Sequence, residues 1–466
     1  MTIRIFDHHV HIAVLLLAAA EFAVCVLAIA GGHWLADSID AHWAHNDNHF
    51  SIWCAALSAF VISLALAAMG LYRLALRATM TGIAARVIVA VVLTGLFLPF
   101  VYYFIPSLYL HPLVMTFSAA LLIVGILIVR YGFSKVVDEN FFKRRVLVIG
   151  AGKRAEQFLT LRRQADQRGF KLVRYISMEG DSGSGALPEK RVRPMPESLY
   201  DYASKHKVDE IVIAMDDRRG KLPVRQLLEC RLQSIDVTDV VSFLERETGK
   251  INLSLVSPSW LIFESGFRRK FGRRVAQRIF DLVASLLVLI PASPVMLVAA
   301  ILIKLEDGGP VFYRQRRVGR NNVNFNVLKF RSMRVDAEKP GQAVWAKKDD
   351  DRVTKVGGVF RKTRIDELPQ LLNVLAGTMS IVGPRPERPE FVEQLSEELP
   401  YYLERHRVRP GITGWAQMSY PYGSSSKDAF EKLQYDLYYV KNRTILLDVM
   451  ILLQTAEVVL WQKGSR

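Results

Sequence analysis

The 466-residue sequence has few cysteines, a deficit of acidic residues and no nucleic-acid-binding motif. Three cysteines are too few for the disulfide framework of a secreted protein, and they suit a reducing compartment. The 45 acidic residues are outnumbered by 61 lysines and arginines, which gives a formal charge of +16. No helix-turn-helix, zinc-binding or RNA-binding pattern accompanies this charge, so we exclude nucleic acid as a partner. We attribute the charge to a membrane surface and to phosphate-containing ligands.

Basic residues are also absent from two loops between long apolar runs near the N-terminus. Four runs are each long enough to cross a bilayer as a helix, at residues 12–31, 52–71, 84–105 and 112–130. The loops at 33–51 and around 106–112 hold no Lys or Arg, whereas the segments on the other side of each run do. This alternation places the N-terminus and everything after residue 130 in the cytoplasm, and it requires the first run to be retained rather than cleaved as a signal peptide.

Three polar features have a simple and a functional interpretation. Glu21 lies in mid-span, where we expect it to be protonated or paired inside the bundle; a transport role is the alternative. His42, His45 and His49 have a spacing that suits a metal, although solvated loop histidines are the simpler interpretation. The aspartates at 349–351 are more typical of a solvated turn than of a metal site.

A strand–helix alternation follows the membrane region and predicts a Rossmann-like domain. The apolar run from Val146 leads into Gly150, Gly152 and Ala155, a G-x-G-x-x-A turn that opens a helix. Further strands are expected at residues 171–176, 210–214 and 235–240. The turn is typical of dinucleotide binding, but the acid expected to hold a ribose is ambiguous near Glu179. We therefore favour a degenerate scaffold that regulates or docks.

A fifth apolar run, at residues 276–304, is interrupted by prolines. Pro291 and Pro294 each remove a backbone donor and bend a helix, and Ser293 can hydrogen-bond a freed carbonyl. Both flanks are basic, so both favour the cytoplasmic side. We expect a re-entrant helix kinked at Ser293 and Pro294; the alternative is an ordinary kinked span, which would place the rest of the chain in the periplasm.

Adjacent carboxylates follow this run, among turns rich in glycine and proline. Thr363 precedes Asp366 as a helix N-cap would, and Gly377 resembles a C-terminal stop. We therefore expect Asp366 and Glu367 in the first turn of a helix, where amide dipoles favour anions. Such a pair suits a divalent cation and a diphosphate, and an aspartate can also attack phosphorus.

Basic residues near this pair suit substrate phosphates, because planar arginine donors match phosphate oxygens. A single arginine would be interpreted as a surface ion pair, but a set around a carboxylate pair favours a site. The candidates are Lys329, Arg331, Arg361, Arg364, Arg385 and Arg409.

These motifs resemble the monotopic phosphoglycosyl transferases, bacterial sugar transferases that initiate polysaccharide and glycan assembly. The resemblance runs from about residue 273 to the end. The matching stretches are Ser293-Pro294, Lys329-Phe-Arg331-Ser-Met, Arg361 through Asp366-Glu367-Leu-Pro-Gln, Gly383-Pro-Arg-Pro386 and Arg409-Pro-Gly-Ile-Thr-Gly414. The whole chain resembles the large form, which includes the undecaprenyl-phosphate glucose and galactose phosphotransferases of exopolysaccharide synthesis.

The resemblance implies transfer of a hexose-1-phosphate from a UDP-sugar to undecaprenyl (polyprenyl) phosphate, with release of UMP. It implies that Asp366 is the nucleophile, that Glu367 is its partner at a magnesium ion (Mg2+), and that Arg361 and Arg385 serve substrate phosphates. This reaction is the first membrane step of exopolysaccharide or capsule biosynthesis. Membrane lipids are further partners, while a homodimer, downstream glycosyltransferases and the identity of the sugar stay open.

The expected fold is a membrane α plus α/β protein in the bacterial inner (cytoplasmic) membrane, with its catalytic domain on the cytoplasmic face. Four transmembrane helices occupy 1–135, a Rossmann-like, CoA-binding-like domain 140–250, and an α/β catalytic domain 271–466. The re-entrant helix and interfacial helices, among them 444–461, would anchor the last domain.

Two other functions fit parts of the sequence. Membrane nucleotide-sugar dehydratases resemble its front half, but they need a second glycine fingerprint and a catalytic Tyr-x-x-x-Lys. The one match, Tyr131 with Lys135, lies upstream of any cofactor site. A membrane scaffold with a dead catalytic domain is disfavoured by the intact Asp366–Glu367 pair.

Overall fold

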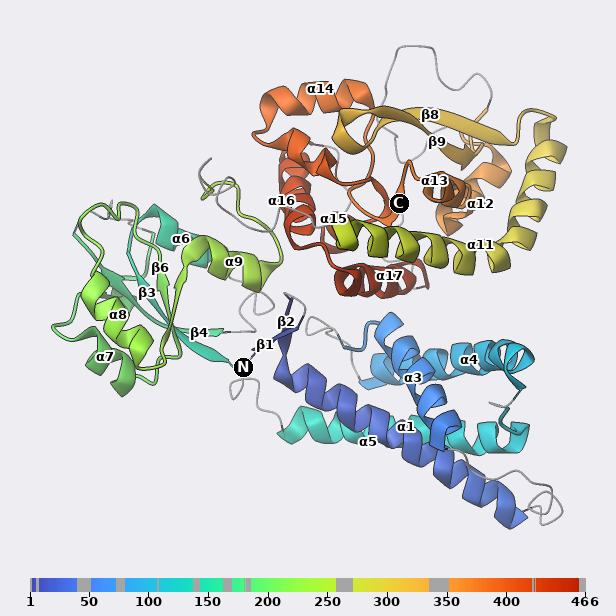
Figure 1. Cartoon of the computed structure of the whole chain (residues 1–466), viewed down its shortest axis with the longest axis horizontal. Helices are drawn as coiled ribbons and strands as arrows, with labels where there is room; N and C mark the ends of the chain where they lie inside the picture. Colours follow the sequence, from blue (N-terminus) through green and yellow to red (C-terminus); the bar gives the residue numbers. More distant parts are fainter. Residues whose placement is uncertain are drawn as a thin grey trace. The chain divides into compact units, whose positions relative to one another are not determined.

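The structure is a computed structural model of the chain, which divides into two compact units, Met1–Thr248 and Gly249–Arg466 (Figure 1). The candidate metal ligands His42, His45 and His49 and the aspartates at 349–351 lie outside the described residues. The residues that the structure describes are 2–5, 8–39, 52–72, 80–106, 109–136, 143–161, 170–179, 181, 186–256, 271–334, 352–420, 423 and 425–460.

All four N-terminal apolar runs form helices, as predicted. They are α1 (Ile12–Ile39), α3 (Ile52–Ala68), α4 (Met80–Phe104) and α5 (Pro112–Val136). Three of them are long and apolar enough to cross a membrane, and α3, with 17 residues, is at the short end of the usual range. Large apolar side chains such as Leu27 and Leu96 remain 70% and 72% exposed, as expected of helices that face lipid. The protein is therefore a membrane protein. A short antiparallel hairpin, β1 (Thr2–Ile5) with β2 (His8–His11), precedes α1 and was not expected.

The bundle contains a buried ion pair between Glu21 of α1 and Arg130 of α5. The Arg130 Nε atom lies 2.6 Å from Oε1 of Glu21, and its Nη2 donates to Oε2 at 3.0 Å. Arg130 also donates to the carbonyl of Leu71 at 3.0 Å, in the turn after α3. The expectation that Glu21 is protonated or paired is thus confirmed as pairing, which removes the cost of an isolated charge in a bilayer.

The second half of the first unit is a five-stranded parallel sheet with helices packed on its faces. The strands are β3 (Arg144–Ile149), β4 (Phe170–Ser177), β5 (Val192–Pro194), β6 (Glu210–Ile213) and β7 (Asp236–Asp239). The helices are α6 (Lys153–Thr160), α7 (Leu199–Lys205), α8 (Val224–Leu232), α9 (Val240–Thr248) and the 3-10 turn η2 (Glu189–Arg191). In space the order is β5-β4-β3-β6-β7, so the first strand along the chain lies at the centre. Four of these strands were predicted to within a few residues, whereas β5 was not.

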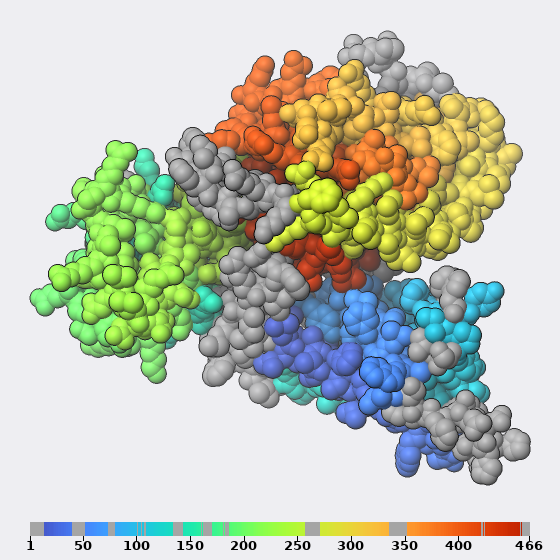
Figure 2. Space-filling view, viewed as in Figure 1, coloured from blue at the N-terminus to red at the C-terminus, as the bar shows by residue number. Residues whose placement is uncertain are grey.

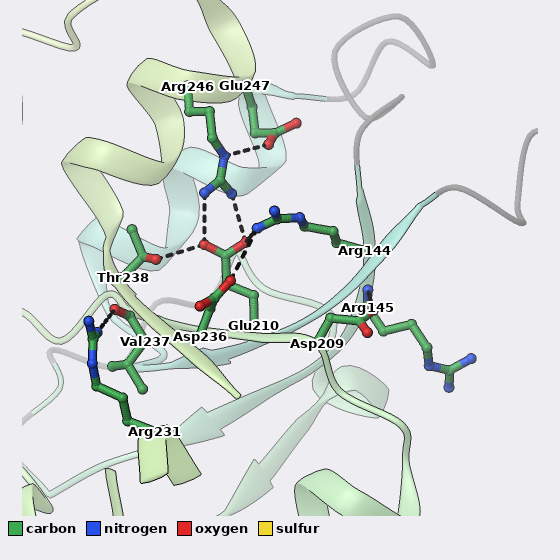
Figure 3. Close-up of polar contacts among 10 residues, drawn as sticks. All are labelled: Arg144, Arg145, Asp209, Glu210, Arg231, Asp236, Val237, Thr238, Arg246 and Glu247. Atoms are coloured by element: carbon green, nitrogen blue, oxygen red, sulfur yellow. Dashed lines mark hydrogen bonds and ion pairs between the residues drawn. The ribbon is translucent and has the colours of Figure 1, made fainter. Parts of the chain in front are cut away.

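Glu210 joins the amino ends of three strands to α9 (Figure 3). Its fully buried carboxylate accepts hydrogen bonds from Arg246 at 2.7 and 3.0 Å and from Thr238 at 2.7 Å, and Arg144 lies 3.3 Å away. Burial would raise the pKa of Glu210, but its hydrogen bonds and ion pair with Arg246 outweigh this and hold the pKa below its usual value. The cluster therefore has a structural role: it links the amino ends of the strands to α9, at the opposite end of the sheet from the glycine-rich turn.

The second unit begins with the long helix α11 (Phe271–Asp307) and the antiparallel hairpin β8 (Phe312–Val318) with β9 (Asn324–Phe330). Two short strands, β10 (Ser380–Val382) and β11 (Gly411–Thr413), pair in parallel. Val382 of β10 belongs to an apolar core that also includes Val374 and Tyr439. The remaining elements are η4 (Arg320–Asn322), α12 (Lys355–Thr363), η5 (Ile365–Glu367), α13 (Gln370–Ala376), α14 (Pro389–Glu398), η6 (Tyr402–Arg407), α15 (Trp415–Ser419), α16 (Ser426–Asn442) and α17 (Ile445–Leu460).

Helix α11 is bent into two arms, and the yellow atoms of the helix lie on the surface of its unit (Figures 1 and 2). Pro294 has no N–H to give to the carbonyl of Ile290, and the Ser293 hydroxyl donates to that carbonyl at 2.7 Å instead. The expected hydrogen bond from Ser293 to a freed carbonyl is therefore present, while its place in a membrane hairpin stays a prediction. Around the bend, Leu287 and Leu297 are 69% and 64% exposed, so this apolar surface has no protein covering it within the described residues.

Candidate active site

The backbone around the carboxylate pair differs from the expected helix start. Thr363 is not an N-cap: it is the last residue of α12, and its hydroxyl donates back to the carbonyl of Val359 at 2.9 Å. Arg364 then adopts a left-handed conformation (φ 61°), which few residues other than glycine favour, and this ends the helix. Asp366 and Glu367 consequently lie in the first turn of a helix, as predicted, but this turn is the 3-10 turn η5 ahead of α13, and Arg364 rather than Thr363 precedes it. Gly377, with φ 83°, does end α13 as predicted.

Glu367 is held by cations from three separate segments. Its Oε1 accepts from Arg385 Nη2 at 2.8 Å and lies 3.5 Å from Lys329 Nζ, while its Oε2 lies 3.4 Å from Arg364 Nη1. Burial would raise the pKa of Glu367, but the charges of Arg385, Lys329 and Arg364 outweigh it and hold the pKa far below its usual value. Glu367 is therefore an anion whose charge is already balanced by the protein.

Asp366 lies beside this cluster and differs from Glu367 in its hydrogen bonding and in the direction of its pKa shift. Its side chain is largely buried, at 9% exposure, yet it receives no hydrogen bond from any residue that the structure describes. Burial, followed by the charge of Glu367, raises the pKa of Asp366 to about 6. Burial also lowers the pKa of Lys329 despite the nearby carboxylates. Asp366 is thus a poorly solvated carboxylate with no hydrogen-bond partner among the described residues, and it lies in the field of Lys329, Arg385 and Arg364, which suits reaction with a ligand.

Two further arginines fix the backbone that carries Arg385. Arg405 donates to the carbonyl of Arg385 at 3.0 Å and is itself held by the buried Asp436 at 2.7 Å. Arg317 donates to the carbonyl of the next residue, Pro386, at 3.1 Å. Because an arginine earlier in the chain and one later in the chain bind these two carbonyls, the backbone that carries Arg385 is held in place next to Glu367.

Comparison with known proteins identifies two matching domain families. A family described as bacterial sugar transferase matches residues 272–462, which include the whole carboxylate cluster, and one described as CoA-binding domain matches residues 67–236. An Aeromonas hydrophila protein named UDP-N-acetylgalactosamine-undecaprenyl-phosphate N-acetylgalactosaminephosphotransferase is 41% identical over 261 residues, 54% of this chain and 58% of that protein.

Two other relatives are similar over more of the chain. The undecaprenyl-phosphate glucose phosphotransferase of Komagataeibacter xylinus is 33% identical over 75% of this chain and 65% of its own length. The UDP-glucose:undecaprenyl-phosphate glucose-1-phosphate transferase of Klebsiella pneumoniae is 36% identical over 70% of this chain and 69% of its own. The chain belongs to the bacterial sugar transferase family. This sugar transferase spans less than two thirds of the first two relatives and slightly more of the third.

Three of the six predicted phosphate-binding cations lie in the cluster of this sugar transferase, and three do not. Lys329, Arg364 and Arg385 surround Glu367. Arg331 is instead paired with Asp307 at the end of α11. Two more predicted cations make no ion pair or hydrogen bond with the carboxylate pair in the described structure. They are Arg361, partly buried in α12, and Arg409, whose charged neighbours include Arg278 and Asp281.

Sequence reasoning missed the supporting roles of Arg317 and Arg405. Arg405 is buried, and its charge is balanced by Asp436. Its neighbour His406 is equally unsuited to bind a phosphate, because burial and the charge of Arg405 lower the pKa of His406 to about 3 and leave it without a positive charge. The sequence offers no signal for this arrangement, because Asp436 lies 31 positions away on α16.

Proposed function

We propose that this sugar transferase moves a hexose-1-phosphate from a UDP-sugar to undecaprenyl phosphate and releases UMP. The observation that carries the proposal is the contrast within the carboxylate pair. Glu367 is paired with three cations, while Asp366 is buried, has a raised pKa and receives no hydrogen bond from the part of the chain that the structure describes. The names of the relatives support both substrates. A partnerless carboxylate beside a cluster of cations suits attack on an anionic diphosphate.

The proposed reaction has two steps. A carboxylate oxygen of Asp366 bonds to the phosphorus that carries the sugar, the bond from that phosphorus to the bridging oxygen breaks, and UMP leaves with the electron pair. An oxygen of undecaprenyl phosphate then attacks the same phosphorus, which returns Asp366 as a carboxylate and gives undecaprenyl-diphosphate-sugar. The first step requires ionised Asp366.

Lys329, Arg364 and Arg385 are proposed to stabilise the charge on the phosphoryl oxygens. The side chains of Arg364 and Arg385 are 43% and 35% exposed, so each can meet a ligand while it remains near Glu367. Their positions are set before the substrate binds, which is how a preorganised site lowers a barrier.

The residues present fit the magnesium ion that the family implies. No three His, Cys, Asp or Glu side chains gather as a complete metal cage in the described part of the chain. Magnesium, however, is usually bound through one or two carboxylates together with substrate phosphates and water. Asp366, which lacks a hydrogen-bond partner among described residues, would hold it together with the substrate phosphates, and the adjacent Glu367 would join when one of its three cations turns to a phosphate. The ion would supply charge neutralisation at the diphosphate.

The proposed organisation is a transmembrane domain at 1–135, a Rossmann-like domain at 140–250 and a catalytic domain at 271–466, in the inner membrane with the catalytic domain facing the cytoplasm. The central position of β3 in the parallel sheet supports the Rossmann-like assignment. The bend in α11, with basic residues at both ends, supports a re-entrant helix.

The re-entrant proposal predicts that both ends of α11 are reachable from the cytoplasm. In a variant without native cysteines, Arg274→Cys and Arg316→Cys should both react with a membrane-impermeant maleimide in inverted vesicles. Both positions are exposed in the structure. Tyr109→Cys, in the loop before α5, should react only in right-side-out vesicles and serves as the control. Labelling of Arg316→Cys only in right-side-out vesicles would show that α11 crosses the membrane.

The proposed activity is tested by UMP release from a panel of UDP-sugars. The full chain in lipid nanodiscs with undecaprenyl phosphate should release UMP from at least one of UDP-glucose, UDP-galactose and their N-acetyl forms, with a lipid-diphosphate-sugar as co-product. UMP without any lipid-linked product would indicate hydrolysis, and no UMP from any donor would contradict the proposal.

A further inference from the structure

The glycine-rich turn of the middle domain already holds an anion, and the chain itself supplies it. The turn at Gly150–Gly152 connects β3 to α6, whose first residues are Lys153 and Arg154. Asp216 accepts hydrogen bonds from both backbone N–H groups, through Oδ2 from Lys153 at 3.0 Å and through Oδ1 from Arg154 at 2.9 Å. The carboxylate thus uses both oxygens at the N-terminus of α6, as a ligand phosphate would.

The amides of Gly150 and Ala151 are also occupied. The N–H of Ala151 donates to Oδ2 of Asp181 at 2.8 Å, and the N–H of Gly150 donates to the carbonyl of Ile176 at 2.8 Å. Asp181 follows β4 and Asp216 follows β6, so the two strands beside β3 each provide a carboxylate to the turn. The two aspartates accept hydrogen bonds from three amides, of Ala151, Lys153 and Arg154, that a turn of this type can offer to a bound phosphate.

The space for a ligand is filled as well. The second glycine of such a turn normally allows a pyrophosphate to approach the backbone. Here a methyl group placed on Gly152 would lie 2.0 Å from Oδ2 of Asp216, so the carboxylate occupies the space beside Gly152. In a sheet of this order, the crevice between β3 and β6 is the place where ligands bind, and Asp216 lies at the end of β6.

We propose that Asp216 takes the place of the ligand phosphate in this turn, so that the domain does not bind coenzyme A or a dinucleotide through it. A second anion at the amides of Lys153 and Arg154 would meet a fixed negative charge, and both donors are already bound to Asp216. The turn therefore does not fit the CoA named in the matching family, and its G-x-G-x-x-A pattern is retained for a structural contact. This inference is independent of the catalytic proposal, since it concerns the first unit alone.

The test compares thermal unfolding of the full chain in nanodiscs with and without pyrophosphate or coenzyme A. Asp216→Ala should lower the midpoint of the transition assigned to the middle domain by about 2–5 °C, because α6 loses its N-terminal cap. Pyrophosphate should restore most of that loss in Asp216→Ala, because it can bind the two freed amides. Coenzyme A should also bind the variant at least about tenfold more tightly than the wild type.

Asp217→Ala is the matched control, since it removes an equal charge from the adjacent, exposed position. Pyrophosphate bound in the catalytic unit affects both variants alike, so the difference between them reports the turn. If Asp216→Ala does not fold, Asp216→Asn keeps one acceptor without the charge and should show a smaller loss with partial restoration. Saturable binding of coenzyme A to the wild type that Asp216→Ala leaves unchanged, or no gain in either Asp216 variant, would overturn the proposal.

Discussion

Asp366→Asn is expected to reduce turnover by about a thousandfold or more without loss of folded protein. Asparagine has nearly the shape of aspartate, and Asp366 receives no hydrogen bond from the described residues, so little structural contact is lost. The amide, however, is a far poorer nucleophile than a carboxylate. The midpoint of thermal unfolding should stay level with the wild type or rise, because a buried carboxylate that burial destabilises has been neutralised.

The decisive measurement is made without the lipid acceptor. Wild-type protein given a UDP-sugar should release about one UMP per active site and retain a phosphosugar on the peptide that contains Asp366, as covalent catalysis requires. Asp366→Asn should show neither. Glu393→Gln, the same change from carboxylate to amide at an exposed position of α14, should behave as wild type.

A different pattern would change the mechanism. If UMP appears only when undecaprenyl phosphate is present, and no phosphosugar adduct forms on the protein, transfer is direct from donor to acceptor. Asp366 would then act as a base or a metal ligand. The proposed overall reaction would stand, because the UDP-sugar panel tests it separately.

The sequence predicts those parts of the fold that local pattern determines. The four N-terminal apolar runs become α1, α3, α4 and α5 because their length and hydropathy leave no other stable structure in a bilayer. The hydrogen bond from Ser293 to Ile290 was also predictable, because it is made within one turn of the same helix. The short strand β5 was missed because three residues hold too little pattern.

The candidate site was predictable in its members but not in its geometry. The sequence indicates Asp366, Glu367 and nearby cations, yet the left-handed Arg364 that separates them from α12 has no local signal such as glycine. Whether a given arginine faces the pair depends on distant partners. Arg331 is taken up by Asp307, which lies 24 positions earlier, and the two aspartates that fill the glycine-rich turn come from other strands.

The charge of Glu367 is expected to control the acidic limb of the pH profile. The first half-reaction requires ionised Asp366, so its rate in the wild type should fall as the pH decreases through about 6. Glu367 is the second largest cause, after burial, of the raised pKa of Asp366, whereas Arg385 lowers that pKa. Removal of either charge should therefore move the limb, and the two removals should move it in opposite directions.

Glu367→Gln should shift the acidic limb to lower pH and Arg385→Ala should shift it to higher pH, although both should reduce the plateau rate by about a hundredfold. The rate falls in Glu367→Gln because Arg385 and Arg364 lose the anion that orients them. The burst of UMP without lipid is the right measurement, since undecaprenyl phosphate itself titrates near pH 6. A purely structural role for these residues would lower the plateau and leave the limb in place. Shifts of both variants in the same direction would assign the limb to a group other than Asp366.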